Sequence, residues 1–587
     1  MPHPKRVAVV GSGLAGLSAA FFLQRAGVEV ELFERSAEPG MDSASVDVDG
    51  HRVDVPFRVF TPDYYPCLHQ LYEHLGVTTL AADNSLSFAR SADRSTLWSY
   101  TNLTIGDFQL PVPDSVSDSV RVAISRDWVR LLFASALAVR TPHSLRLYGP
   151  LDVPVAEYLA AERYTEEFTA GVMLPFIAGV CTCSIGASAA YPANAVLHFM
   201  AKVAFGARLR KARGGVREVC RRLLKNQKTI HYSTPVARIT SDLRVITEED
   251  GLDGLRSSFD AVVLATPADT AACLARHVAP DLAAALDAVG YEDACVVTHR
   301  DASVMPAQQE DWRGVNISSS SGGGGGARAM ATHWLNRVED SSTSGRAFAT
   351  QLFQTVDPHP RLDPSTIAAP AAGFHRSLLS VESQRALSQI HRMQGQAGLW
   401  VVGSYAAPGV PLLEGCVRSA ADVAAALNAP AAFSLPTLTR SHSTPAKPSY
   451  SVGLAPGMVR GELVDAFFER DGTGTFDFAR PALLPPPLFL SSSSRRLDTC
   501  SLLQWARAWL AWFSFIVALP AISALLSAFT YLLTAVLGST AAAHRAQMAI
   551  LDTMVYIICS IAIAIRHISS RKEQPTNQSI HPSKKSL

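Results

Sequence analysis

The sequence predicts an α/β fold in which a buried parallel sheet is assembled from distant parts of the chain. The first observation is an apolar run, Val7–Val10, that leads directly into a glycine-rich turn. The second is that similar apolar runs recur at Val28–Phe33, Phe259–Leu264 and Leu399–Val402, as expected of strands covered on both faces. The third is a long stretch from about residue 80 to 200 that is apolar but irregular, unlike the regular runs on either side of it.

The turn after the first strand has the spacing G-x-G-x-x-G. Gly11 allows the tight turn, Gly13 lets the backbone approach a pyrophosphate, and Gly16 lets the following helix pack closely on the strand. That helix is predicted over Leu14–Ala26, and its free N–H groups would point at the phosphates. Glu34 ends the second strand, where a carboxylate can accept hydrogen bonds from a ribose. The unit predicts a bound dinucleotide, and both NAD and FAD use it.

The residues that follow favour FAD. The segment Glu34–Gly40 resembles the E-R-x(4)-G segment of the flavin amine oxidase and phytoene desaturase superfamily. Most members have a second glycine there, whereas this chain has Met41. The resemblance implies a Rossmann-like FAD-binding domain that is discontinuous in sequence and carries an α+β substrate domain as an insertion.

A closer resemblance is to the predicted FAD/NAD(P)-binding oxidoreductases that are encoded beside, or fused to, cyclopropane fatty acid synthases. Asp54–Phe60 resembles their D-x-G-F-x-V-F block, with Pro56 in place of the glycine, and Tyr65–Leu68 resembles their Y-P-x-L block. His299–Pro306 resembles their H-x-D-x(3)-M-P block. His299 and the aspartate two residues later could serve in acid–base chemistry or simply hold a loop. We assign no catalytic residue from the sequence.

The last strand and its turn resemble the C-terminal FAD motif of the superfamily. The resemblance implies that Gly403 and Ser404 lie along the ribityl-phosphate chain and that the helix beginning near Leu412 points its N-terminus at the flavin, favouring negative charge on the reduced ring. Some relatives attach the flavin through a cysteine shortly before this turn. None lies between Cys295 and Cys416, so non-covalent FAD is expected.

Together these motifs predict a set of cofactor-binding positions, with Val236 equally compatible with an adenine contact or an ordinary core valine. The predicted positions are Gly11, Gly13, Leu14, Ala15, Gly16, Glu34, Arg35, Gly40, Phe57, Arg58, Val236, Thr266, Pro267, Gly403, Ser404, Leu413, Glu414 and Val417. We expect no metal site, because Cys181 and Cys183 lack a second ligand cluster. We expect no nucleic-acid partner, because the formal net charge is only +1.

Two apolar runs near the C-terminus predict membrane attachment. Ala508–Ala543 contains no charged residue, and Leu510–Leu537 is the expected core of a first span. Met548–Ile565 is a second apolar run, interrupted only by Asp552. The alternative is a pair of buried helices in a soluble domain. Basic residues flank the outer ends of both runs, so the predicted arrangement is a hairpin whose ends, and the FAD domain, face the cytosol.

The length of 587 residues predicts two or three domains. The predicted boundaries are 1–60, 205–290 and 390–430 for the FAD-binding domain, 61–204 and 291–389 for the substrate domain, 431–507 for a linker, 508–568 for the transmembrane hairpin and 569–587 for a cytosolic tail.

These features predict a membrane-anchored, FAD-dependent oxidoreductase. It would take a hydride from a lipid or fatty-acyl substrate and pass electrons to an acceptor. One alternative is a tethered amine oxidase that acts on a soluble amine. Another is a non-catalytic flavin-binding scaffold for a lipid-modifying enzyme, which would then be its partner.

Overall fold

The computed structural model describes residues 5–105, 108–140, 152–203, 206–249, 258–319, 327–338, 348–359 and 362–429, with four residue pairs between 552 and 563. Its helices are α1 (Leu14–Arg25), α2 (Pro66–His74), α3 (Ser119–Arg140), α4 (Val155–Ala161), α5 (Glu166–Phe168), α6 (Leu174–Cys181), α7 (Ile185–Ala189), α8 (Ala193–Val203), α9 (Gly215–Leu223), α10 (Ala268–Ala275), α11 (Pro280–Asp287), α12 (Leu335–Val338), α14 (Val381–Met393) and α15 (Leu413–Ala426).

The strands form two large sheets and three two-stranded antiparallel pairs. They are β1 (Arg6–Val10), β2 (Glu29–Phe33), β3 (Val46–Val48), β4 (His51–Val53), β5 (Thr79–Ala81), β6 (Leu86–Arg90), β7 (Thr96–Ile105), β8 (Phe108–Pro113), β9 (Gly206–Ala207), β10 (Arg210–Ala212), β11 (Thr229–His231), β12 (Val236–Ile239), β13 (Val245–Thr247), β14 (Ala261–Leu264), β15 (Tyr291–His299), β16 (Val315–Ser319), β17 (Ala329–Trp334), β18 (Phe353–Val356), β19 (Ala372–Ser377) and β20 (Leu399–Val401).

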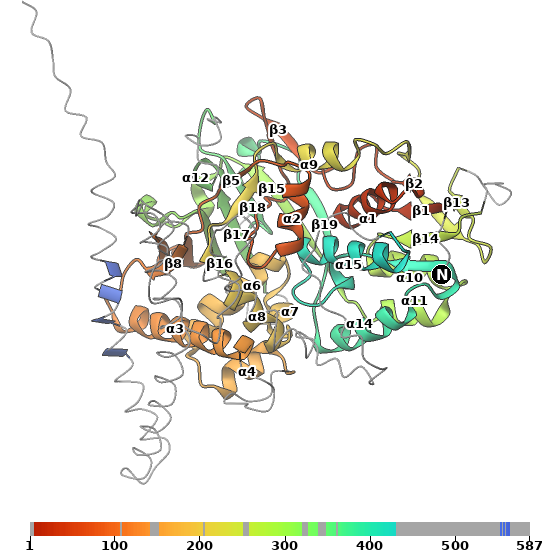
Figure 1. Ribbon diagram of the computed structural model, residues 1–587. Coiled ribbons are helices and arrows are strands. Elements are labelled where there is room, and N and C mark those ends of the chain that lie inside the picture. The colour runs from red at the N-terminus through yellow and green to blue at the C-terminus, as the bar shows by residue number, and fades with distance from the viewer. Residues whose placement is uncertain are drawn as a thin grey trace, which may run out of the picture.

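The first large sheet is fully parallel and has the strand order β11-β2-β1-β14-β20. Its strands β2, β1 and β14 are labelled in Figure 1. Alternate residues of β1 enter different cores. Val7 and Val9 belong to the buried cluster that includes α1 and α15, whereas Ala8 and Val10 belong to the cluster that includes α10 and α11. Helices therefore cover both faces, which is why the central strands β1, from Val7 onward, and β14 are continuously apolar in sequence. The predicted parallel α/β sheet is confirmed.

The second large sheet has nine strands in the order β19-β15-β18-β17-β16-β6-β7-β8-β9. Neighbouring strands are antiparallel except β16 and β6. Helices α3, α6 and α8 lie together beside this sheet (Figure 1). Trp98 of β7 and Trp128 of α3 are buried between them, with ring centroids 5.2 Å apart. These two aromatic residues therefore belong to the core of this region.

One predicted element is wrong in detail. The apolar pattern predicts a single helix over Val155–Phe168, but α4 ends at Ala161 and α5 begins at Glu166. Arg163 separates them with φ +55°. A helix cannot continue through a residue in the left-handed region, so the chain turns there.

Within the described ranges, no helix combines the length and apolar composition that a membrane crossing requires. The predicted hairpin, 508–568, lies outside the described residues apart from the four pairs between 552 and 563. The predicted linker and cytosolic tail lie outside them entirely. The strands of the parallel sheet all fall inside the ranges predicted for the FAD-binding domain, while the exact domain boundaries stay a prediction.

Candidate functional site

The glycine turn between β1 and α1 contains two glycines that the fold requires and one that it does not. Gly11 has φ +102°, and a Cβ atom there would lie 2.7 Å from the Ala265 carbonyl oxygen. A Cβ on Gly16 would lie 1.9 Å from the Gly11 carbonyl oxygen. A Cβ on Gly13 would meet no protein atom within 4 Å. Gly11 and Gly16 are therefore required for packing, whereas Gly13 leaves a cradle open for a ligand at the start of α1.

Glu34, at the end of β2, is held against this turn. Its Oε2 atom accepts hydrogen bonds from the Ser12 N–H, at 2.9 Å, and from the Ser12 hydroxyl. Its Oε1 atom accepts one from the Ser36 N–H at 2.8 Å. Because each carboxylate oxygen has two lone pairs, Oε1 keeps capacity for one further donor, such as a ribose hydroxyl. The turn and the acid are thus brought together, as the sequence motif requires.

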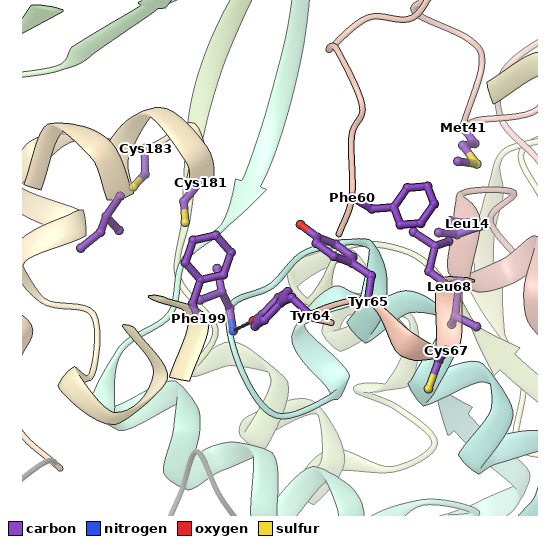
Figure 2. Close-up of a cluster of buried hydrophobic side chains, with 14 of the residues drawn as sticks. Leu14, Met41, Phe60, Tyr64, Tyr65, Cys67, Leu68, Cys181, Cys183 and Phe199 are labelled. Atoms are coloured by element: carbon purple, nitrogen blue, oxygen red, sulfur yellow. Dashed lines mark hydrogen bonds between the residues drawn. The ribbon is translucent and has the colours of Figure 1, made fainter. Parts of the chain in front are cut away.

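The segment after Glu34 closes over the same turn. The Gly40 N–H donates to the Ser12 hydroxyl at 2.8 Å, and the Met41 N–H donates to the Ser12 carbonyl at 3.3 Å. Met41, which replaces the second glycine of the family, turns its side chain into the core near Leu14 (Figure 2). Arg35 is exposed. The methionine therefore preserves the backbone contact while its side chain fills core space.

The segment leading to β12 is also tied to Glu34. The Thr234 N–H donates to the Glu34 carbonyl oxygen at 2.8 Å, so the chain enters Val236 close to the end of β2. Val236 is half-buried and packs against the cluster under the parallel sheet. A contact between its backbone and an adenine stays a prediction.

At the other end of the site, the carboxyl ends of β14 and β20 meet the first turn of α15. The Tyr405 hydroxyl donates to the Thr266 carbonyl at 3.0 Å. The Gly403 N–H donates to the Ser419 hydroxyl at 3.0 Å. A Cβ on Gly415 would lie 2.6 Å from the Ser404 carbonyl oxygen. This close approach sets the N-terminus of α15 directly against Ser404.

Three of the predicted positions on α15 serve the protein interior. Both carboxylate oxygens of Glu414 accept backbone hydrogen bonds at the start of α2, from the N–H groups of Cys67 (3.0 Å) and Leu68 (3.1 Å). Val417 is completely buried in the core, and Leu413 packs against that core. The Glu414 side chain therefore caps α2, and its predicted contact with the cofactor stays a prediction.

The loop after β4 carries two predicted cofactor-binding residues, Phe57 and Arg58, in different surroundings. The Phe57 N–H donates to the Gln354 side chain, and the Phe57 ring lies in a buried cluster with Leu335. Arg58 donates from Nη2 to the Met41 carbonyl at 3.3 Å, while its Nε atom is buried without a hydrogen-bond partner among the described residues. Pro267 follows Thr266 and precedes the first turn of α10.

Arg376 of β19 was missed by the sequence analysis. Its guanidinium lies over the Phe374 ring, 4.8 Å from the centroid, and its buried Nε atom has no hydrogen-bond partner in the described part of the chain. Burial and the positive charge of Arg58 lower the pKa of Arg376 to about 10. Both arginines are electrostatic neighbours of Cys416 in the first turn of α15. In the sequence, Arg376 is an ordinary arginine that follows Phe374 and His375, and no spacing pattern marks it as a binding residue.

A row of buried aromatic rings, which the sequence analysis also missed, runs from Phe60 to Phe199 of α8. Tyr64 and Tyr65 lie between Phe199 on one side and Phe60 on the other (Figure 2). Ring centroids are 4.8 Å apart for Tyr64 and Phe199, 5.1 Å for the two tyrosines, and 6.3 Å for Tyr65 and Phe60. The Tyr64 hydroxyl accepts a hydrogen bond from the Val410 N–H at 3.0 Å. The row provides an apolar wall between α2 and α8.

His299 has a structural role. Its ring is fully buried, its Nδ1 atom accepts from the Asp301 N–H at 3.1 Å, and its Nε2 atom is 2.7 Å from the Thr355 hydroxyl. Burial lowers the pKa of His299 to about 4. Both ring nitrogens are therefore occupied inside the nine-stranded sheet. Of the two possibilities that the sequence left open, the geometry favours the loop-holding one.

The geometry as a whole fits a dinucleotide with a flavin end. The Gly13 cradle and the N-terminus of α1 suit a pyrophosphate, and Glu34 suits a ribose. The N-terminus of α15 suits the electron-rich ring system of a reduced flavin. The guanidiniums of Arg58 and Arg376, which have no carboxylate partners among the described residues, add positive charge near that end of the site. Contacts of the individual predicted positions with FAD stay predictions.

Comparison with known proteins gives partial sequence relatives and a shared fold. The chain is 33% identical to a zeta-carotene desaturase of Synechocystis sp. over 133 residues, which are 20% of this chain and 27% of that protein. It is 46% identical to a hydroxyneurosporene desaturase of Rubrivivax gelatinosus over 56 residues, which are 10% of this chain and 11% of that protein. The chain thus matches about a quarter or less of the length of these curated relatives.

Among solved structures, a fatty acid isomerase from P. acnes that produces CLA superposes with a TM-score of 0.50 at 15% sequence identity, covering 73% of this chain and 99% of that one. At this identity the likeness describes the fold. The model of the family described as flavin containing amine oxidoreductase matches residues 14–369, more than half of the chain. The chain therefore belongs to the flavin containing amine oxidoreductase family and is an FAD-dependent oxidoreductase.

Proposed function

We propose that the chain is a membrane-anchored oxidoreductase with non-covalently bound FAD, which removes a hydride from a lipid or fatty-acyl substrate. FAD, when bound, supplies the hydride acceptor. The apolar runs within 508–568 support the anchor, and their basic flanks support a cytosolic FAD domain. The anchor would hold the site next to the phase in which such substrates dissolve.

The observation that carries the choice of substrate is the unpaired positive charge around Arg376. Arg376 is half-buried, and its Nε atom is buried without a hydrogen-bond partner among the described residues. A partly desolvated guanidinium without an anionic partner is costly, and a bound anion offsets that cost. Arg58 and the N-terminus of α15 add to the same positive potential. An acidic head group, such as a fatty-acid carboxylate, is therefore favoured. A cationic amine would be repelled, which argues against a tethered amine oxidase.

In this proposal, different residues bind the cofactor and the substrate. Gly13 and the N-terminus of α1 bind the pyrophosphate, and Glu34 orients the ribose next to it. The row of Tyr64, Tyr65, Phe60 and Phe199 excludes water from the apolar part of the substrate. Arg376 orients the acidic end. Two of the curated relatives are named as carotenoid desaturases, which supports an apolar substrate that loses hydrogen from carbon.

The experiment uses the full chain purified in detergent. Yellow protein whose flavin is released on denaturation would support non-covalent FAD, and anaerobic bleaching by a fatty acid would support turnover. Flavin that is bound but never reduced by any lipid extract would favour the scaffold alternative. Bleaching by putrescine but not by fatty acids would favour the amine oxidase alternative. The variant Gly13→Asp should remove both flavin and activity, because the added carboxylate repels the pyrophosphate.

The substrate contact is tested with Arg376→Gln. We expect flavin content to stay normal and the apparent affinity for a fatty acid to fall about tenfold, consistent with loss of a charge-assisted hydrogen bond. The matched control is Arg385→Gln, which changes an exposed arginine of α14. Equal fatty-acid affinity in Arg376→Gln and the control would contradict the proposed acidic head group.

A further inference from the structure

The second C-terminal apolar run, Met548–Ile565, contains one acid, Asp552. The residues of this run that the structure describes are helical. An aspartate in an apolar helix is costly unless it is paired, so its partner decides where the helix can lie.

Helix α3 carries a buried cation that needs such an acid. Asp127 is fully buried and accepts from Arg126 Nε at 3.0 Å, from Arg130 Nη1 at 2.9 Å, and from the Thr165 N–H and hydroxyl at 2.8 and 2.7 Å. One carboxylate thus serves two guanidiniums. The Arg126 side chain is only 7% exposed, so the excess positive charge is poorly solvated.

Asp552 supplies the missing charge. Its Oδ1 atom is 2.9 Å from Arg126 Nη1. Next to this ion pair, Cys559 and Val116 form a small buried cluster with Val122 and Ile563 packed against it. Figure 1 shows the described pieces of the C-terminal segment beside the end of α3. Charge complementarity and apolar contact therefore coincide at the start of α3.

Two neighbouring apolar side chains of the same segment are exposed. Tyr556 and Ile557 are each 51% exposed. Elsewhere in the described ranges, Ile367, at 38%, is the one other large hydrophobic side chain that is exposed to this degree. Exposed apolar side chains gathered on one segment indicate a surface that another apolar phase covers.

We propose that the surface formed by Val116, just before α3, and by Val122 and Arg126 of α3 is the docking surface for the described residues of the second apolar run, and that the exposed side chains of Tyr556 and Ile557 lie in the surface of a phospholipid bilayer. The substrate half of the enzyme, instead of the parallel-sheet half, then faces the lipid. The inference rests on the membrane anchoring in the proposed function. In place of a second membrane span, the described residues between 552 and 563 would then lie between enzyme and lipid.

The docking is tested by thiol cross-linking in the full-length, flavin-loaded chain. Val116→Cys introduces a thiol next to the native Cys559, and a specific protease site is inserted between residues 443 and 450. After treatment with a short bis-maleimide and cleavage, we expect the two fragments to stay joined on a denaturing gel. The same chain with Cys559→Ser, and a chain with Asp281→Cys on the exposed surface of α11 in place of Val116→Cys, serve as controls.

The ion pair is tested from the C-terminal side, so that the core around Asp127 is not disturbed. Asp552→Arg should lower the cross-linked fraction about fivefold, which corresponds to about 1 kcal/mol of lost pairing. Asp552→Glu should keep most of it. Cross-linking no better than in the controls, or unchanged by Asp552→Arg, would overturn the docking surface.

The lipid contact is tested with vesicles of phosphatidylcholine that carry a photoactivatable acyl chain. We expect peptides containing Tyr556 and Ile557 to be labelled and peptides of α11 to stay unlabelled. Cross-linking without lipid labelling of 552–563 would overturn the bilayer half of the inference. Flavin content and reduction by fatty acid are measured on the same samples. A failure of the proposed chemistry is thereby distinguished from a failure of docking.

Discussion

The parallel-sheet half and the nine-stranded half of this molecule use their residues in different ways. In the parallel half, the site consists of backbone turns at strand ends, where Gly11, Gly13 and Glu34 lie within one β-α-β unit. In the nine-stranded half, the site depends on side chains such as Arg376 and Phe199, which packing brings from distant segments. The comparison teaches that backbone geometry shapes the proposed cofactor cradle, whereas the proposed substrate contacts depend on side-chain placement.

The largest effect should come from Gly16→Ala. The new Cβ atom would clash with the Gly11 carbonyl oxygen, which belongs to the turn and cannot move aside without distorting it. We expect a loss of at least about 3 kcal/mol in the free energy of unfolding, together with loss of flavin. Thermal unfolding followed by circular dichroism measures it. A normal melting temperature would show that the turn is more tolerant than its geometry indicates.

The next effect separates fold from ligand within the same turn. Gly13→Ala adds a methyl group where no protein atom lies within 4 Å, so the melting temperature of the flavin-free protein should not fall. The affinity for FAD should fall at least about tenfold, because the methyl group occupies the pyrophosphate cradle. Gly373→Ala on β19, which also has open space around it, is the control and should leave FAD affinity unchanged.

A smaller, pH-dependent effect should be confined to the nine-stranded half. The pKa of His299 is lowered to about 4 by burial, whereas an unfolded histidine titrates near 6.5. The unfolded state therefore binds the proton first, and stability is lost as the pH falls from about 6.5 to 4, by up to about 1.4 kcal/mol per pH unit.

The corresponding experiment records unfolding by tryptophan fluorescence between pH 7.5 and 4.5. His299→Gln should flatten the dependence of stability on pH in this window. His277→Gln, which removes an exposed ring near the end of α10, controls for the loss of a histidine. An unchanged slope in His299→Gln would contradict a buried neutral ring.

The smallest effect concerns a contact between the two halves. The His375 ring nitrogens lie 2.7 Å from Asp293 and 2.8 Å from Asp269 of α10, and these carboxylates raise the pKa of His375. The stabilisation is present when the ring is protonated and is lost as the pH rises through that raised value. Since the ring is 41% exposed, His375→Gln should cost about 0.5 kcal/mol or less at pH 6. The cost should vanish at pH 9, as measured by urea unfolding.

Much of the fold could be predicted from the sequence because its signals are local. The strand β1, the helix α1 and the end of that helix before Gly27 follow from apolar runs and glycines within a few residues of one another. The hairpin of β3 and β4 follows from Asp49 and Gly50, which both have positive φ. The break at Arg163 was missed, because an apolar pattern does not report a left-handed residue that tertiary packing imposes.

The candidate site was predictable only in part. Its backbone positions follow from motif spacing, but the partners of its charges do not. Glu414 caps α2, a helix nearly 350 residues earlier in the chain, and no local pattern encodes that contact. The burial of the Arg376 Nε atom without a partner among the described residues is likewise a result of tertiary packing, which no local pattern encodes.

The sequence by itself determined the parallel sheet, the glycine turn with its acid, and the resemblance to flavin amine oxidoreductases, because each depends on steric rules acting between near neighbours in the chain. The tertiary structure alone decided which charges meet. It paired Asp552 with Arg126 and left Arg376 without an anion among the described residues. The physical reason is that electrostatic interactions in a folded interior depend on distance and burial, which packing sets across hundreds of residues.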